Sequence, residues 1–169
     1  MILPAHSALD KINESYKLDA SIRGRFIVDA VQVEMLVSYI IAEHFFPNSK
    51  AKRDSFFSLI LNRSDFTFSM KFKIFMEIMQ LKHKTLFTQH QKNLKKIKHM
   101  MELRNKLAHC YFGLNDAQLV AKDTIRLTYY KKGNAEKLDL SKSKMEEESR
   151  ECLNIVISLL GIRDKIGRK

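Results

Sequence analysis

The spacing of apolar residues predicts a mainly helical chain. From Phe26 to Phe45 apolar side chains recur every three or four positions, the period of an amphipathic helix, and Pro47 is expected to end that helix. A shorter helix is predicted before it, with Asp19 or Ser21 capping the start of the longer one. The predicted core positions of the long helix are Phe26, Ile27, Ala30, Val33, Val37, Ile40, Ile41 and Phe45.

Two more helices are predicted in the middle of the chain. The connection over residues 48–65 is polar and contains one short helical piece, and an amphipathic helix is expected from Thr67 onward. Thr88 and Gln91 have the spacing of a capping box, which predicts that the next helix begins there and ends near Tyr111.

The period changes in the last third. Residues 124–140 alternate apolar and polar positions around a turn at 132–134, which predicts a β-hairpin. Ser143 and Glu146 form a second capping-box pattern, so a closing helix is expected, with apolar positions at Leu153, Val156, Leu159 and Leu160. The predicted fold is an up-and-down helical bundle with a small hairpin before the last helix, in one domain over residues 1–169.

The net charge of +11 points to an anionic partner. Residues 49–109 carry fourteen basic and four acidic side chains, so +10 of the excess lies in this stretch. A polyanionic partner, either nucleic acid or an anionic surface, is therefore considered, and the functional surface is expected within this part of the chain.

Other features exclude several classes of protein. Cys110 and Cys152 belong to no C-x-x-C pair, which argues against a zinc site or a secreted disulfide scaffold and favours the reducing cytoplasm. The N-terminal segment does not resemble a signal peptide, and the longest charge-free apolar run, residues 153–162, is too short to span a bilayer, so no membrane partner is expected. The spacings among His83, His90 and His99 fit no zinc motif, and no cofactor or metal is expected.

The segment RNKLAHCY, residues 104–111, holds the most informative chemistry. Arg104 is a permanent cation that can bind a phosphate, and His109 can donate or accept a proton near neutral pH. These groups suffice for cutting RNA without a metal: the ribose 2′-hydroxyl attacks phosphorus, the histidine transfers protons, and the arginine stabilises the added negative charge.

The spacing within this segment constrains how the residues work together. On an ideal helix Arg104 and His109 lie about 140° apart, whereas Asn105 and His109 are i, i+4 neighbours, so Asn105 is expected to orient the imidazole. Convergence of Arg104 and His109 requires a distorted helix end, a long reach or a second subunit. The alternative is a solvated arginine and a hydrogen-bonded histidine that favours the helix C-terminus for its charge.

The same segment resembles the R-x4-6-H signature of the HEPN superfamily (higher eukaryotes and prokaryotes nucleotide-binding). The resemblance implies a helical bundle that forms a homodimer, with Arg104, His109 and Asn105 as catalytic residues of a metal-independent endoribonuclease in a toxin–antitoxin or antiphage system. Tyr111 extends the match to R-x4-H-x-Y, which resembles toxins whose tyrosine is adenylylated by an antitoxin of the nucleotidyltransferase type. The alternative is a tyrosine that packs at the helix end. Other members of the superfamily bind nucleotides or RNA, or act as scaffolds, without catalysis.

Further candidates lie around the motif. RNA phosphates are expected to contact Lys95, Lys96, Lys98 and Lys106, although a run of lysines is commonly a solvated face. Tyr129 and Tyr130 could stack on bases or pack within the hairpin. Glu34 and Glu43 are expected on an exposed helix face, and the alternative is a dimer interface or a pocket. A basic DNA-binding regulator is a third possible function, for which the sequence shows no clear helix-turn-helix pair.

Overall fold

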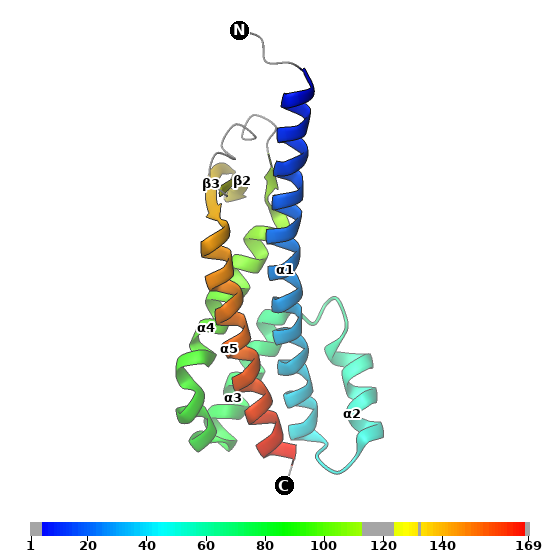
Figure 1. Ribbon diagram of the computed structural model, residues 1–169. Coiled ribbons are helices and arrows are strands. Elements are labelled where there is room, and N and C mark those ends of the chain that lie inside the picture. Colours follow the sequence, from blue (N-terminus) through cyan, green and yellow to red (C-terminus); the bar gives the residue numbers. More distant parts are fainter. Residues whose placement is uncertain (1–4, 113–123, 132, 168–169) are drawn as a thin grey trace. The chain divides into compact units, whose positions relative to one another are not determined.

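A computed structural model describes residues 5–112, 124–131 and 133–167. Its helices and strands confirm a mainly α fold with a β-hairpin before the last helix (Figure 1). The helices are α1 (Ala5–Phe45), α2 (Lys50–Phe56), the π-helical turn η1 (Phe57–Leu61), α3 (Phe68–Lys82), α4 (Lys84–His109) and α5 (Lys142–Gly167). The strands are β1 (Tyr111–Phe112), β2 (Thr124–Lys131) and β3 (Asn134–Ser141).

The chain divides into two compact units. Unit 1 comprises residues 1–28 and 102–150, and unit 2 comprises residues 29–101 and 151–169. Helices α1, α4 and α5 each contribute residues to both units. All residues of the RNKLAHCY segment belong to unit 1, which therefore holds the candidate site.

The N-terminal part is one helix where two were predicted. Helix α1 continues from Ala5 to Phe45 without a break, and Asp19 does not cap a helix. Its buried carboxylate instead forms an ion pair with Arg23 one turn later. The predicted end before Pro47 is confirmed, and most of the predicted core positions are buried, although Phe45 is about half exposed.

Two predicted helix starts are wrong for a shared reason. Helix α4 begins at Lys84, so Thr88 lies inside it, and helix α5 begins at Lys142. The Ser141 hydroxyl accepts a hydrogen bond from the amide of Lys144 (3.1 Å), which makes Ser141 the capping side chain in place of Ser143. A capping pattern shows which residues are able to cap, whereas the neighbouring element decides where the helix begins. In contrast, Thr67 caps α3 as predicted, with its hydroxyl accepting from Met70 (3.4 Å).

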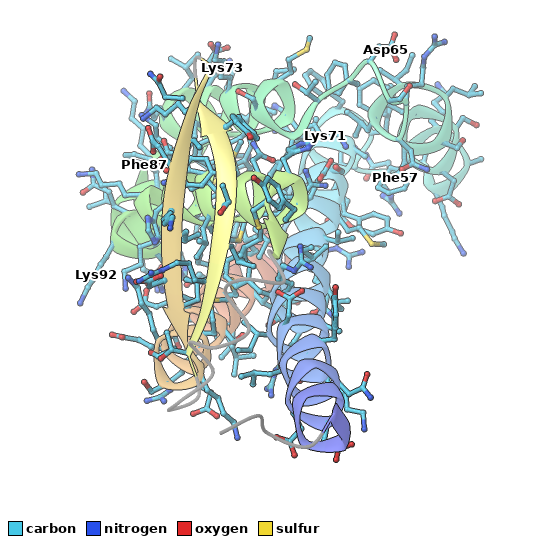
Figure 2. All side chains as sticks on the ribbon, turned by 90° about the horizontal axis from the view of Figure 1, so that it is seen from above. Phe57, Asp65, Lys71, Lys73, Phe87 and Lys92 are labelled. Carbon is cyan, nitrogen blue, oxygen red and sulfur yellow. The ribbon has the colours of Figure 1, made fainter. Side chains whose placement is uncertain are left out.

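Unit 2 is a helical bundle held by cross-helix polar contacts. Helices α4 and α5 run antiparallel, as shown by the contacts of Gln89 with Lys165 and of Asn93 with Ser158. Glu34 pairs with Lys71 of α3 (labelled in Figure 2) at 2.5 Å, and this lysine is buried. Glu43 is buried and pairs with Arg163 of α5, so the expectation of an exposed face is wrong for Glu43, whereas Glu34 is partly exposed.

Helix α5 also differs from the predicted apolar face. Leu153 and Leu160 are exposed, and the buried positions of the helix are Met145, Cys152, Ile155, Ser158, Leu159, Ile162 and Ile166. The buried face is therefore rotated from the one expected, because the segment offers more apolar residues than one face can hold.

Unit 1 contains a three-stranded antiparallel sheet in the order β1-β2-β3. The predicted hairpin is confirmed: β2 pairs with β3 from Thr124 opposite Ser141 to Lys131 opposite Asn134. The turn places Gly133 at φ +82°, a conformation that favours glycine. Strand β1 was not predicted, because Tyr111 was assigned to the preceding helix. In the structure Tyr111 pairs with Thr128 of β2. Leu127 and Leu140 are buried on the inner face of this sheet.

Candidate functional site

The candidate site lies on the last turns of α4. The helix is regular to His109, and its hydrogen bonding continues with the amide of Cys110 donating to the carbonyl of Lys106 (2.9 Å). A distorted helix end is therefore not available to bring Arg104 and His109 together. At 3.6 residues per turn the two side chains leave the helix about 140° apart. Their convergence on one phosphate therefore requires a long reach by the arginine or a second subunit.

The polar partner of the arginine is its neighbour. Arg104 donates a hydrogen bond from Nη1 to Oδ1 of Asn105 (3.1 Å), and Arg104 is partly exposed while Asn105 is exposed. Asn105 was expected to orient the imidazole of His109, and this arrangement corrects that expectation. The amide oxygen of Asn105 accepts from the guanidinium and so orients Arg104 rather than His109.

His109 is exposed at the C-terminal end of α4. Its imidazole makes no hydrogen bond or ion pair with any residue in the described ranges 5–112, 124–131 and 133–167. The alternative interpretation of His109 as a hydrogen-bonded histidine therefore has no support among those residues. An exposed imidazole at a helix end is accessible to a substrate.

A clamp from α1, which the sequence did not reveal, holds this helix end. Arg23 donates from Nη1 to the carbonyl oxygen of Cys110 (3.1 Å), one residue beyond His109, and forms an ion pair with Asp19. Asp19 is buried, and its Oδ1 atom has no hydrogen-bond partner among the described residues. The guanidinium thus bonds a carbonyl that α4 leaves unsatisfied, and it fixes the main chain next to the histidine.

Replacing Arg23 with methionine should destabilise the protein by leaving Asp19 buried without its cation. Removing one partner of a buried ion pair costs roughly 3–5 kcal/mol, and because the arginine side chain is 26% exposed we expect about 3 kcal/mol in urea unfolding. The double variant Asp19→Asn with Arg23→Met should lose less than the single variant, since no buried charge is left unpaired. A single variant as stable as the unsubstituted protein would show that the clamp contributes nothing.

Cys110 supports the same helix end as a buried thiol. Its Sγ atom lies 3.3 Å from the carbonyl oxygen of Leu107, and burial raises the pKa of the thiol above its ordinary value. The thiol is therefore protonated near neutral pH and packs as a small apolar group. No disulfide links Cys110 and Cys152, and both residues are buried.

The four predicted RNA-binding lysines differ in their surroundings. Lys95 and Lys98 are exposed on α4 within unit 2. Lys96 forms an ion pair with Glu151 of α5, which neutralises its charge. In unit 1 the ammonium of Lys106 lies 5.4 Å from the centre of the Tyr129 ring, a cation–π contact. Lys95 and Lys98 are thus the better candidates for phosphate contacts.

The positive charge is distributed differently from the sequence expectation. Unit 2 has sixteen basic and eight acidic side chains, a net charge of +8, whereas unit 1 has fourteen and eleven, a net charge of +3. The basic stretch 49–109 is divided between the units after residue 101. Lys73 and Lys92 of unit 2 extend outward from their helices (Figure 2). Most of the positive excess therefore lies outside the unit that carries Arg104 and His109.

The tyrosines around the site are arranged in a way that the sequence did not predict. Tyr129 and Tyr130 are neighbours on β2, so their side chains point to opposite faces of the sheet. Tyr129 bonds Glu136 through its hydroxyl, an interaction that raises the pKa of the tyrosine. Tyr130 stacks instead with Tyr111 of β1, with ring centres 6.2 Å apart and planes inclined by 27°.

Two histidines of unit 2 lie next to each other. Nδ1 of His44 lies 3.2 Å from Nε2 of His83, and burial together with the charge of Lys82 lowers the pKa of His44. The pKa of His90 is also lowered, mainly by burial and to a smaller extent by the charge of Lys165. Within the described part of the chain, no three side chains of His, Cys, Asp or Glu gather as metal ligands.

In the same described ranges, no helix combines the length and the apolar content that crossing a membrane requires. A scan against family models and searches of curated proteins and of solved structures give no match to this chain.

Proposed function

We propose that the protein is a metal-independent endoribonuclease in which Arg104 and His109 act on one phosphate. The observation that carries the proposal is the exposed His109 imidazole at the end of a regular helix, five residues after Arg104 and next to a main-chain carbonyl clamped by Arg23. His109 would take the proton of the attacking 2′-hydroxyl and give a proton to the leaving 5′-oxygen, while Arg104 would stabilise the charge on the phosphate. The products would carry 2′,3′-cyclic phosphate and 5′-hydroxyl ends.

A homodimer is part of this proposal. Because α4 is regular, Arg104 and His109 of one chain leave the helix in different directions. A two-fold axis near the end of α4 would place Arg104 of one protomer beside His109 of the other, and the same pair would then form twice. The resemblance of RNKLAHCY to the HEPN signature supports this arrangement, and with it a role as a toxin or antiphage effector.

A specific observation favours the second candidate, a non-catalytic module that binds RNA or a nucleotide. Within one chain, Arg104 is directed by Asn105 rather than toward His109, so a single chain offers a cation for binding without a complete catalytic pair. This candidate expects retention of RNA on a filter with no turnover, whereas the endoribonuclease cleaves the RNA that it binds.

Tyr111 keeps its proposed link to an antitoxin. Its side chain is 49% exposed, two residues after His109, so a nucleotidyltransferase could reach the hydroxyl. Adenylylation there would place a bulky anion beside the site. Incubation with ATP and the product of a neighbouring gene should then add one adenylyl group to the protein, and Tyr111→Phe should prevent the addition; modification of the phenylalanine variant would exclude this residue.

The different surroundings of the lysines lead to a salt-dependence test of RNA binding. Each lysine that neutralises a phosphate of a single strand contributes about 0.7 to the slope of log Kd against log salt concentration. Replacing Lys95 and Lys98 with glutamine should reduce that slope by about 1.4, whereas Lys96→Gln should leave it unchanged because Lys96 is paired with Glu151. Filter binding from low to moderate salt measures both slopes. If Lys96→Gln reduced the slope as much as each of the other two lysine changes does, the assignment of phosphate contacts to Lys95 and Lys98 but not to Lys96 would be contradicted.

A further inference from the structure

We infer that Tyr111 and Tyr130 form a stacking platform for an unpaired base of single-stranded RNA. The inference rests on the proposed function in taking RNA as the ligand, and it adds a binding site that holds the strand beside His109. Both residues lie in unit 1 with the motif, so the argument concerns this unit alone.

The register of the sheet places the two tyrosines on one face. Tyr111 is directly opposite Thr128, and Tyr130 follows Thr128 by two residues on the same strand. Residues opposite one another, and residues two apart, share a face, so Tyr111 and Tyr130 are diagonal neighbours. The observed stacking of their rings, 6.2 Å between centres, agrees with that placement.

Both tyrosines lie on the more exposed face of the sheet, where Thr128 of the central strand is nevertheless buried. Leu127 and Leu140 alternate with these positions and are buried at 0% and 1%, so the opposite face carries the core of the sheet. Tyr130 is 65% exposed and Tyr111 is 49% exposed. Two aromatic rings, stacked on each other and open to solvent, present a flat apolar surface of the kind on which RNA bases stack.

The charges on the same face suit a nucleic acid strand. Lys137 is opposite Thr128, which places Tyr111, Thr128 and Lys137 in one row across the three strands. Lys137 is exposed, whereas Arg126 is bound by Asp139 through two hydrogen bonds of 2.5 and 2.6 Å. The arginine holds the pKa of Asp139 below its ordinary value, so this carboxylate stays charged and paired. Lys137 thus supplies a cation on the same face of the sheet, diagonal to Tyr130 across the β2–β3 pair.

The platform lies close to the candidate catalytic histidine. Tyr111 follows His109 by two residues, so their Cα atoms are at most about 7 Å apart whatever the conformation of the chain. A base stacked at the edge strand β1 would bring its own or the adjacent phosphate toward the end of α4. The platform would therefore select RNA whose bases are unpaired, because bases within a duplex already stack on their neighbours.

The test uses a single-stranded RNA oligonucleotide that carries 2-aminopurine, a base whose fluorescence falls when it stacks on an aromatic ring. The protein is the full chain with His109→Ala, so that the RNA stays intact. We expect quenching on binding, loss of the quenching with Tyr130→Leu, and a rise in Kd of at least about five-fold. Tyr130→Phe should keep both the quenching and the affinity, since the ring remains.

The matched control is Tyr129→Leu, the same change one position earlier on the opposite face, which should retain the quenching. Circular dichroism and thermal unfolding establish that each variant is folded. Quenching that persists in folded Tyr130→Leu, or that is equal with the same RNA in a duplex, overturns the platform. Cleavage by the unsubstituted protein is scored separately: cleavage without Tyr130-dependent quenching refutes the platform alone, and quenching without cleavage supports the platform while refuting the nuclease.

Discussion

Replacing His109 with alanine is expected to lower the rate of RNA cleavage by about 10²- to 10⁴-fold, the contribution typical of a positioned general acid–base group. The side chain is exposed and bonds to no residue in the part of the chain that the structure describes, so its removal should not alter the fold. The melting temperature and the Kd for RNA should therefore stay close to those of the unsubstituted protein. Gel analysis of a labelled single-stranded RNA measures the rate.

A matched control for this variant is His99→Ala, which removes an exposed histidine from the same helix within unit 2. This change should leave cleavage at the level of the unsubstituted protein. Cleavage that is unaffected by His109→Ala would remove the assignment of a catalytic histidine. Equal losses in both variants would indicate that α4 matters through its structure rather than through His109.

Mixing two inactive variants should restore cleavage if the site is shared between protomers. Neither Arg104→Ala nor His109→Ala should cleave RNA alone. In an equimolar mixture, half of the dimers contain one of each variant, and each of these has one intact site built from the remaining Arg104 and the remaining His109. We expect about a quarter of the original activity, as counted from sites in a two-fold dimer.

The mixing experiment separates a shared site from a site within one chain. The two variants are unfolded together and refolded, so that subunits exchange, and sedimentation measures the dimer content. Restored cleavage in the mixture, with none in either variant alone, supports the shared site. A mixture that dimerises and stays inactive would place Arg104 and His109 of one chain in the same site, which requires the arginine to reach around the helix.

The parts of the fold that were predicted correctly depend on local sequence. The hairpin follows from the alternation of β2 and β3 and from a turn with Gly133 at positive φ. The end of α1 before Pro47 follows from the clash of a proline ring with the preceding turn. The beginning of α3 at Thr67 follows from a hydroxyl that accepts an amide of the first turn.

The parts that were not predicted depend on contacts between distant residues. Asp19 is a residue type that commonly caps helices, but here it lies inside one long helix. There it pairs with Arg23, which also bonds the Cys110 carbonyl, 87 residues away. The pairing of Tyr111 with Thr128 likewise ends α4 two residues earlier than its sequence pattern predicts. The helical spacing also predicted a contact between Asn105 and His109. In the structure the amide oxygen of Asn105 instead accepts a hydrogen bond from the guanidinium of the adjacent Arg104.

Most residues of the candidate site were found from the sequence, but their grouping was not. Arg104, His109 and Tyr111 stand in a short motif, and Tyr130 was noted as an aromatic on the hairpin. The alternation of the strand separates Tyr130 from Tyr129 and joins it to Tyr111. Arg23 had no signal of its own, because an arginine four residues after an aspartate is common on exposed helices.

The most direct test of the proposed chemistry is the reaction of the unsubstituted protein, in the presence of EDTA, with a single-stranded RNA and with the same RNA lacking every 2′-hydroxyl. We expect cleavage of the first, with 2′,3′-cyclic phosphate and 5′-hydroxyl ends identified by mass spectrometry, and no cleavage of the second. Cleavage of the substrate without 2′-hydroxyl groups, or products of the first that end in 3′-hydroxyl and 5′-phosphate, would contradict attack by the ribose and with it the roles assigned to Arg104 and His109.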